Sequence, residues 1–566
     1  MESNGMTDWN ESYDFVVVGS GGGGLCAALV MRQAGKSVLV LEKTDQLGGT
    51  TARSGGVMWI PNNPLMARAG EQDSPELAMA YLDALNEGVD DAPGASRLRR
   101  QTYVNEAPQM LAFLMRKGMK FGRAPFWPDY HDELPGGSKS SRSVTPALFN
   151  AKELGAYCSK LRRGRFGGIP ATNEELMKLP QLKQSWRAKL LLARIGWRKV
   201  RARLTGQDIV AAGTALQGRL LQIALKAGVQ FRTDAGVDQL VEDKGAIIGV
   251  VTQKDGQPWR IGARLGVLVA AGGFARNQAM RDQYIPGTSV AWTMAGPGDT
   301  GEMIVEMQRH GAAIAQMNEM VGHQITLPPG EEQSEFKPSA QRLTAAPHAI
   351  LVDQSGQRYM NEGGSYLTYC RTMLERNQSV PAVPSYAIFD DHVMRSYMIG
   401  NAFPSVPKPA SWTKQGYLAK ADTIEQLART LGIDPAALKA TVARFNEHAA
   451  QGRDPDFHRG ERAYDNFLGD PFYPGNASLG PLDTAPFYAV PVLPGDVGTY
   501  GGVVTDEYGR VLRADGSAIV GLYATGTSTA SVMGRSYAGA GSSVGPSFVF
   551  GYVAAKHAAN IGNQAL

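Results

Sequence analysis

The chain has 566 residues and a mass of 60.7 kDa, enough for about three to four folding units with a large buried core. Its 43% hydrophobic and 19% charged residues, and the lack of an apolar run of about twenty residues, exclude a disordered or membrane-spanning chain. The first residues are acidic and only three cysteines occur, so we expect a cytoplasmic protein without a secretory signal.

A dinucleotide-binding unit is predicted near the start of the chain. Residues 14–18 read DFVVV, which is a buried-strand pattern, and a glycine-rich turn then leads into a helical pattern. Gly19 permits the turn, Gly21 lets the backbone approach a pyrophosphate at the helix N-terminus, and Gly24 lets helix and strand pack closely. Glu42 ends a second strand pattern 18 residues after Gly24 and is placed to accept a ribose hydroxyl. We therefore expect a nucleotide site rather than a purely structural turn.

A second stretch of small residues indicates that the cofactor is FAD rather than NAD. It runs from Lys43 to Gly56, and its glycines and hydroxyl groups would lie against a cofactor that extends beyond the adenosine half. Two later segments, 266–277 and 521–551, also read as a buried strand followed by a glycine-rich turn. Both ends of the chain are thus predicted to build the nucleotide fold.

The predicted fold class is α/β, α+β overall: a Rossmann-like FAD-binding domain built from both chain ends, with an inserted α+β catalytic domain. The FAD-binding domain is assigned to residues 1–151, 207–279 and 497–566. Sequence rich in proline and aromatic residues, with helices of its own, assigns the catalytic domain to 280–496. A basic amphipathic insertion occupies 152–206.

Positive charge is concentrated in this insertion. Residues 152–206 hold 14 basic and 3 acidic residues, net +11, whereas the rest of the chain holds 43 and 50, net −7. After Pro180, apolar residues recur in steps of three and four, which draws one stripe along a helix: Leu182, Trp186, Leu190, Ala193, Trp197, Val200 and Leu204. Basic residues flank the stripe: Lys183, Arg187, Lys189, Arg194, Arg198, Lys199, Arg201 and Arg203.

Three interpretations of this stripe are open. The helix packs its stripe on its own domain and leaves its basic side in water, or it docks on a membrane surface, where two Trp and adjacent cations suit the headgroup region. Nucleic-acid binding is the third interpretation. It is disfavoured because the sequence around the basic patch shows no motif of a nucleic-acid-binding fold. Gly196 weakens a long rigid helix by about 1 kcal/mol relative to Ala.

Several motifs together resemble the flavoprotein superfamily of fumarate reductases and 3-ketosteroid dehydrogenases. They are DFVVVGSGGGG, EKTDQLGGTTARSGG, VLVAAGGF, PGDTGEM, RYMNE and the C-terminal YATGT block, and they span most of the chain apart from 152–206. A fumarate-reductase-like member would need a His before GG near 500 and an Arg near 537 to hold a dicarboxylate. This chain reads GDVGTYGG and RSYAGAG there, so the resemblance favours the 3-ketosteroid Δ1-dehydrogenases.

This resemblance implies an FAD-dependent enzyme that removes hydrogen from C1 and C2 of a 3-ketosteroid. Tyr537 and the Gly541 amide match the pair that binds the C3 carbonyl, and Tyr366 matches the base. Tyr130 matches the tyrosine that supports the base, although the family tends to show two adjacent aromatic residues where this chain has Tyr-His. Tyr369 lies close enough in sequence to Tyr366 to compete for the base role.

The implied chemistry has a clear physical requirement. Desaturation beside a ketone needs donors on the carbonyl oxygen that stabilise the developing enolate, and each donor contributes about 3–4 kcal/mol. A tyrosine base has an ordinary pKa of about 10, so a hydrogen-bond donor or a positive charge should lower the pKa. An uncharged, phenol-lined site also suits an apolar substrate, because buried cations would be left unpaired there.

The predicted FAD contacts extend beyond the residues already discussed. They include Ser20, Lys43, Gly49, Thr50, Thr51, Ser54, Gly55, Gly56, Val237, Ala271, Gly272, Gly526, Ser543 and Val544. Asp299 precedes an apparent helix, where N-capping is its default role, and the resemblance makes a flavin contact the alternative. Eight His residues occur without metal-ligand spacing, so we predict no metal site.

Other functions stay open at this point. An enzyme of the same fold could form the 4,5 double bond of a 5α-3-ketosteroid or desaturate a simpler cyclic ketone. A protein of another class, a membrane-attached flavin-bearing binding protein with little turnover, is the further alternative. The partners we expect are a 3-ketosteroid, with a sterol side chain if 152–206 docks on the inner face of the cell membrane, and an external electron acceptor such as a quinone. We expect no nucleic acid.

Overall fold

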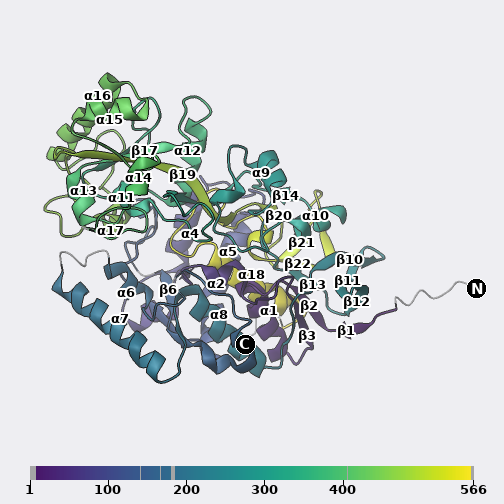
Figure 1. Ribbon diagram of the computed structural model, residues 1–566. Coiled ribbons are helices and arrows are strands. Elements are labelled where there is room, and N and C mark those ends of the chain that lie inside the picture. Colours follow the sequence, from purple (N-terminus) through teal and green to yellow (C-terminus); the bar gives the residue numbers. More distant parts are fainter. Residues whose placement is uncertain (1–7, 141, 166, 180–184, 405, 562–566) are drawn as a thin grey trace, which may run out of the picture.

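The computed structural model describes residues 8–140, 142–165, 167–179, 185–404 and 406–561 (Figure 1). The described residues form a larger unit that contains the first and the last of them, a smaller unit drawn in green, and a helical insertion drawn in blue (Figure 1). Helix α1 (Gly22–Gln33), near the start of the chain, packs against α18 (Val544–Ala558), near its end.

The larger unit is built on a sheet whose central strands are parallel. The strand order is β1-β12-β11-β22-β13-β2-β3-β9, with β10 beside β11 and β21 beside β22. The bounds are β1 (Glu11–Tyr13), β2 (Phe15–Val18), β3 (Val38–Leu41), β9 (Gln230–Arg232), β10 (Val237–Asp243), β11 (Ala246–Lys254), β12 (Gln257–Ala263), β13 (Val267–Val269), β21 (Arg510–Leu512) and β22 (Ala518–Ala524). Strands β2, β3 and β13 are runs of apolar residues buried on both faces, as in sheets covered by helices on both sides.

This arrangement confirms the predicted α/β class and its use of both chain ends. Strand β22, from the C-terminal part, pairs in parallel with β13, and β13 pairs in parallel with β2. Glycines let the terminal helices touch: a Cβ on Gly551 would lie 2.2 Å from the backbone oxygen of Gly23. The other helices of this unit are α2 (Gly49–Arg53), α3 (Pro64–Arg68), α4 (Pro75–Leu85), α5 (Arg97–Arg116), α8 (Ala212–Lys226), α9 (Gln278–Tyr284) and α10 (Glu302–Arg309). Short strands complete it: β4 (Met58–Trp59), β5 (Phe121–Arg123), β6 (Ser143–Pro146), β14 (Ile314–Ala315) and β20 (Gly502–Val503).

The smaller unit packs helices on an antiparallel sheet. Its order is β15-β19-β17-β16, with β18 beside β19, and the bounds are β15 (Met320–Ile325), β16 (Ala349–Val352), β17 (Ser385–Phe389), β18 (Ala419–Ala421) and β19 (Phe487–Thr499). The helices are α11 (Gln341–Ala345), α12 (Tyr366–Arg376), α13 (Asp391–Ser396), α14 (Ala410–Lys414), α15 (Ile424–Leu431), α16 (Pro435–Ala450) and α17 (Ala463–Leu468). Helix α12 packs on β15, and its first residue, Tyr366, contacts rings of the larger unit.

The insertion projects from a two-stranded sheet of β7 (Phe149–Asn150) and β8 (Ile209–Val210). It contains α6 (Asn173–Lys178) and α7 (Trp186–Leu204), and Figure 1 shows α7 along the outer edge of the molecule. The predicted helix is present, but its apolar stripe is exposed, which contradicts the interpretation that the stripe packs on the chain's own domain. Leu182 and Lys183 of the predicted pattern lie outside the described residues. Within the described ranges, no helix combines the length and the apolarity needed to cross a bilayer.

Candidate active site

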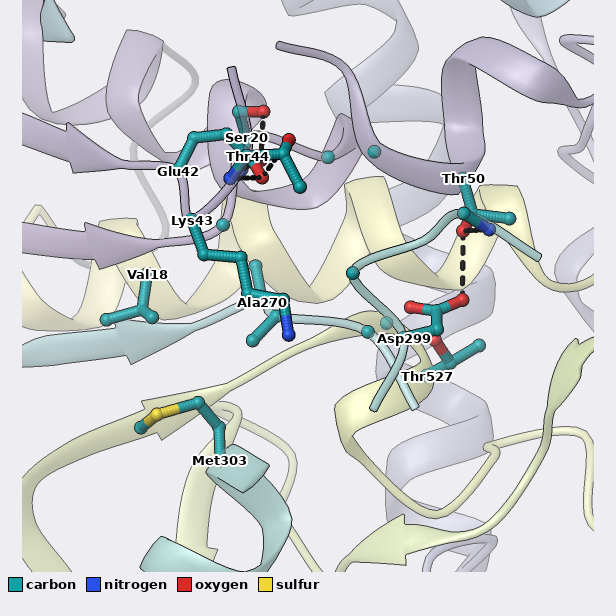
Figure 2. A pocket seen from close by; sticks show the side chains of 18 of the residues that line it. Val18, Ser20, Glu42, Lys43, Thr44, Thr50, Ala270, Asp299, Met303 and Thr527 are labelled. Atoms are coloured by element: carbon teal, nitrogen blue, oxygen red, sulfur yellow. Dashed lines mark hydrogen bonds between the residues drawn. The ribbon is translucent and has the colours of Figure 1, made fainter. Parts of the chain in front are cut away.

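A cleft opens at the carboxyl ends of β2 and β3, where α1 begins (Figure 2). This is the edge at which parallel α/β sheets bind their ligands. The predicted FAD contacts that line the cleft are Gly19, Ser20, Gly21, Glu42, Lys43, Gly49, Thr50, Thr51, Val237, Ala271, Gly272, Asp299 and Gly526. Gly24, Ser54, Gly55, Gly56, Ser543 and Val544 are not part of its lining.

The backbone around the cleft has the shape and the donors for a dinucleotide. Gly19 has φ +102°, and a Cβ there would lie 2.3 Å from the carbonyl oxygen of Ala270. A Cβ on Gly21 would meet nothing nearer than 3.9 Å and would project into the cleft. Gly21, the N-cap of α1, has no side chain to cap the helix. The Gly22 amide donates to the Thr51 hydroxyl at 3.3 Å, and the amides that follow it can face a pyrophosphate. These residues fit the adenosine and pyrophosphate parts of FAD.

Glu42 is held in place by its neighbours. The Ser20 hydroxyl donates to one carboxylate oxygen at 2.6 Å, and the amide and hydroxyl of Thr44 donate to the other at 3.0 and 2.8 Å. The side chain is buried but still lines the cleft, as Figure 2 shows. A carboxylate fixed in this way can accept a ribose hydroxyl without first losing side-chain entropy.

Asp299 lies next to Thr50 in the wall of the cleft (Figure 2). The Thr50 hydroxyl donates to its carboxylate at 2.9 Å, and burial raises the pKa of Asp299 to about 6. Helix α10 begins at Glu302 with Gly301, at φ +82°, as its N-cap, so the default assignment of Asp299 as the cap was wrong. A carboxyl that titrates near neutrality at the cleft wall can bond to a cofactor as acceptor or as donor.

Of the predicted contacts outside the cleft lining, several support its walls. A Cβ on Gly24 would lie 2.4 Å from the carbonyl oxygen of Gly19, so Gly24 allows the close approach of helix and strand. Gly56 has the same role against α8, where a Cβ would lie 2.6 Å from the backbone of Ala212. Ser543 lines a second, smaller cavity that also contains Gly526 and therefore adjoins the cleft.

The three tyrosines implied by the resemblance meet in one cluster. The ring centroid of Tyr366 lies 5.2 Å from that of Tyr130 and 5.0 Å from that of Tyr537. The rings of Tyr130 and Tyr537 are 5.6 Å apart and both are buried, whereas Tyr366 is half-buried. They come from a loop after β5, from the start of α12 and from the segment before α18. Residues more than 150 positions apart in the sequence thus form one phenolic surface.

The Tyr537 hydroxyl is surrounded by hydrogen-bonding groups. It lies 3.0 Å from the Ser543 hydroxyl, and the amides of Gly541 and Ser543 bond toward its oxygen. Gly541 has φ +94°, and a Cβ there would lie 2.4 Å from the carbonyl oxygen of Val57, so only glycine fits. The Gly541 amide therefore lies beside the Tyr537 oxygen, which places two donors next to each other, and Ser543 connects them to the smaller cavity that adjoins the cofactor cleft.

Burial dominates the acidity of the cluster. It raises the pKa of Tyr366 well above its ordinary value, and the nearby phenols of Tyr130 and Tyr537 raise the pKa further. The expectation that a neighbouring donor lowers the pKa of this tyrosine is thus not met in the protein alone. Tyr369, the alternative base, lies away from the cluster in a separate buried group with Tyr359 and Thr344 as neighbours.

Sequence reasoning missed several residues around this cluster. The Tyr464 ring stacks on Tyr130 at 4.1 Å, and the Gln341 amide donates to the Tyr464 hydroxyl at 3.0 Å. The His323 ring lies edge-on to Tyr366 at 5.7 Å, and burial lowers the pKa of His323 to about 4, so this ring is neutral. No local pattern marks these residues, because they meet only through tertiary packing.

A buried ionic network holds the loop that carries Tyr130. Arg142 donates to Asp129 at 2.9 Å and to Asp73 at 2.7 Å, and the Trp59 indole donates to Asp129 at 2.7 Å. The Tyr130 amide also donates to the carbonyl of Ala538 at 3.0 Å. The network fixes this loop against the segment that contains Tyr537.

Two groups of His and Asp side chains lie close together in the described part of the chain, away from the cluster: His348, Asp390 and His392, and His448, Asp454 and Asp456. Their polar atoms bond within the protein, for example His348 Nδ1 to the carbonyl of Pro481 at 2.6 Å and Asp454 to Arg358 at 2.7 Å. The prediction that the chain has no metal site stays a prediction.

Comparison with known proteins adds independent findings. A family model described as an FAD binding domain matches residues 14–544. The chain is 37% identical to a 3-oxosteroid 1-dehydrogenase of Mycobacterium tuberculosis, over 97% of this chain and 99% of that protein. It is 34% identical to 4-oxocyclohexanecarboxylate 2-dehydrogenase of Sinomonas cyclohexanicum, over 96% of this chain and 92% of that protein. It is also similar to the crystal structure of the 3-ketosteroid Δ1-dehydrogenase of Sterolibacterium denitrificans in complex with 1,4-androstadiene-3,17-dione, with a TM-score of 0.89, 34% identity and coverage of 97% of this chain and 100% of that one.

Proposed function

The chain belongs to the FAD-binding flavoproteins of the 3-ketosteroid Δ1-dehydrogenase family, and we propose that it catalyses the 1,2-desaturation of a 3-ketosteroid. One observation carries this proposal: Tyr130, Tyr366 and Tyr537 meet in a single cluster beside the cofactor cleft. The relatives named 3-oxosteroid 1-dehydrogenase support the reaction and the substrate class.

Each residue of the cluster has its own role in the reaction. The Tyr537 hydroxyl and the Gly541 amide donate to the C3 carbonyl oxygen, which makes the C2 hydrogen acidic and stabilises the enolate as it develops. Tyr366 takes the C2 proton at its phenol oxygen. With the steroid bound, the Tyr130 hydroxyl donates to the phenolate form of that base and so offsets the burial that raises the pKa of Tyr366 in the protein alone. Bound FAD supplies the acceptor for the hydride that leaves C1.

Aromatic rings around the tyrosines favour a steroid as substrate. Phe126, Trp127 and Phe467 form a partly exposed group whose ring centroids lie 5.6 to 6.3 Å apart, and Phe467 continues it to Tyr464. Such a wall can bury the fused apolar rings of a steroid without leaving polar groups unpaired.

A simpler cyclic ketone is the second candidate substrate, because one relative is named 4-oxocyclohexanecarboxylate 2-dehydrogenase. Its carboxylate would require a cation within reach of the carbonyl pair. The rings that pack against Tyr537 are phenols, which favours the steroid, whereas the Arg342 guanidinium lies over Phe467 rather than over Tyr537.

Two further partners complete the proposal. An external acceptor, for which a quinone is the candidate, reoxidises the reduced enzyme. Residues 152–206 attach the protein to the inner face of the cell membrane, where sterol-type ketones dissolve.

The experiment is an incubation with androst-4-ene-3,17-dione, cholest-4-en-3-one, a 5α-3-ketosteroid and 4-oxocyclohexanecarboxylate in the presence of an artificial electron acceptor. The proposal predicts loss of two hydrogens from a steroid and a new C1–C2 double bond. Desaturation at C4–C5 of a 5α-steroid alone, or turnover of the cyclohexane acid alone, would replace this function with another. Anaerobic addition of the steroids should also bleach the flavin, and an unbleached flavin would favour the binding protein with little turnover.

A further inference from the structure

Helix α7 presents an apolar face to solvent. Trp186 is 78% exposed, Trp197 66% and Leu204 78%, and Leu190 and Val200 between them are 69% and 50% exposed. These side chains follow the stripe expected from the sequence, on a helix of 19 residues. A contiguous exposed group of this size marks an interaction surface rather than scattered apolar residues.

The other side of the same helix anchors it to the protein. Its buried residues are Ala188, Ile195 and Ala202, which recur every seven positions. At about 100° per residue, they lie about 180° around the helix from the stripe of Trp186, Trp197 and Leu204. Helix α7 is therefore attached through two alanines and one isoleucine and directs its two tryptophans outward.

Positive charge flanks the exposed stripe on both sides. Helix α7 contains seven Lys and Arg residues and no acidic residue. Arg198 pairs with Glu175 of α6 at 2.8 Å. The other six have no carboxylate within ion-pair distance in the described ranges: Arg187, Lys189, Arg194, Lys199, Arg201 and Arg203. Lys189 lies over the Trp186 ring at 4.5 Å, which places a cation directly beside the stripe.

We propose that the outward face of α7 docks on a membrane of anionic lipids. The indoles of Trp186 and Trp197 and the leucines between them enter the boundary of the acyl chains, and the flanking cations contact the negative headgroups. An anionic membrane suits both the apolar stripe and the cations beside it. A nucleic acid would leave the apolar stripe in water, and a second copy of this helix would bring its cations against those of the first.

The docking face is connected to the substrate site. Arg198 joins α7 to α6, and the Asn173 amide of α6 donates to the carbonyl of Gly55, beside the cofactor cleft, at 2.8 Å. Met177 of α6 accepts from Arg342 at 3.5 Å, and the Arg342 guanidinium lies 5.5 Å from the centre of the Phe467 ring. Phe467 is one of the rings that continue to Tyr464, so a chain of contacts runs from the docking helix to the rings of the proposed steroid site. Docking rests on this geometry, and its use for steroid entry rests on the proposed function.

Vesicle flotation of the FAD-loaded full chain tests the proposal. The probes are vesicles of phosphatidylcholine alone and of phosphatidylcholine mixed with phosphatidylglycerol. We expect the wild type to float with the mixed vesicles and to be released by high salt. The double variant Trp186→Ser, Trp197→Ser should bind at least about tenfold more weakly, because two large apolar side chains are lost. Leu98→Ser, on α5 with a 53% exposed side chain, is the matched control and should float like the wild type.

The outcomes separate docking from catalysis. The double variant should keep wild-type turnover of androst-4-ene-3,17-dione dissolved in water and lose turnover of cholest-4-en-3-one supplied in mixed vesicles. Recovery of the wild type only in the lipid-free fraction overturns the docking proposal, and so does equal flotation of the double variant. A dimer that the double variant dissociates, or RNA binding without flotation, also overturns it. Flotation without desaturation of any steroid leaves docking intact and removes the proposed function instead.

Discussion

Replacement of Tyr366 by Phe removes one hydroxyl and keeps the ring that packs beside Tyr130 and Tyr537. The lost group hydrogen-bonds to the Tyr537 phenol, so the free energy of unfolding should fall by only about 1 kcal/mol. The residues that line the cofactor cleft are unaffected, so FAD should bind as before. A general base accelerates a reaction by about 10²–10⁴-fold, and we expect flavin reduction by a 3-ketosteroid to slow by that factor.

The assay is anaerobic stopped-flow bleaching of the bound flavin with androst-4-ene-3,17-dione at saturation. Tyr369→Phe is the matched control, since Tyr369 is a buried tyrosine on the same helix, away from the cluster, and its variant should reduce flavin at the wild-type rate. Reduction by Tyr366→Phe within about threefold of the wild type would refute the assignment of the base, given the size expected of a general base. An equal loss in both variants would refute the geometric reasoning that separates the two tyrosines.

Three other predictions follow from the same geometry. Tyr537→Phe should lower kcat/KM by about 10²–10³ through loss of one donor to the carbonyl oxygen, whereas Tyr500→Phe, whose ring is 6.1 Å away, should keep activity. Gly272→Ala should yield protein with little bound FAD in its absorbance spectrum, because a Cβ at φ +86° would lie 1.7 Å from a buried carboxylate oxygen, and Gly168→Ala, in open space, should retain FAD. Because the pKa of Tyr366 is raised, its reactive phenolate is scarce at neutral pH, so the reduction rate should increase about tenfold per pH unit in the alkaline range. A rate that is constant above pH about 7 would contradict the raised pKa. It would mean that the base is already ionised at pH 7, although the ordinary pKa of tyrosine is near 10.

The nucleotide half of the site could be predicted from the sequence because its determinants are local. Gly19, Gly21 and Glu42 lie within one strand-turn-helix-strand unit, where spacing alone fixes their positions. The tyrosine cluster carries no such pattern, because α12 and the loop before α18 meet only in the folded chain. Its three tyrosines were predicted only through the family resemblance, and Tyr464 and His323 were not predicted.

Two alternatives that local patterns left open were wrong for physical reasons. Periodicity correctly predicted a helix at α7, but an apolar stripe usually faces the core, and here the small residues Ala188 and Ala202 face it instead. Asp299 resembled a helix cap because it precedes an apparent helix, yet the left-handed Gly301 delays the start of α10 and leaves the carboxylate facing Thr50. In both cases tertiary contacts overrode a pattern that is reliable only on average.

The most direct test of the central claim is the crystal structure of the FAD-loaded protein with a bound 3-ketosteroid. The account predicts that the C3 oxygen lies within hydrogen-bond distance of both the Tyr537 hydroxyl and the Gly541 amide, with C2 facing the Tyr366 oxygen. A steroid bound with its C3 oxygen turned away from that pair, or with C2 remote from Tyr366, would contradict it.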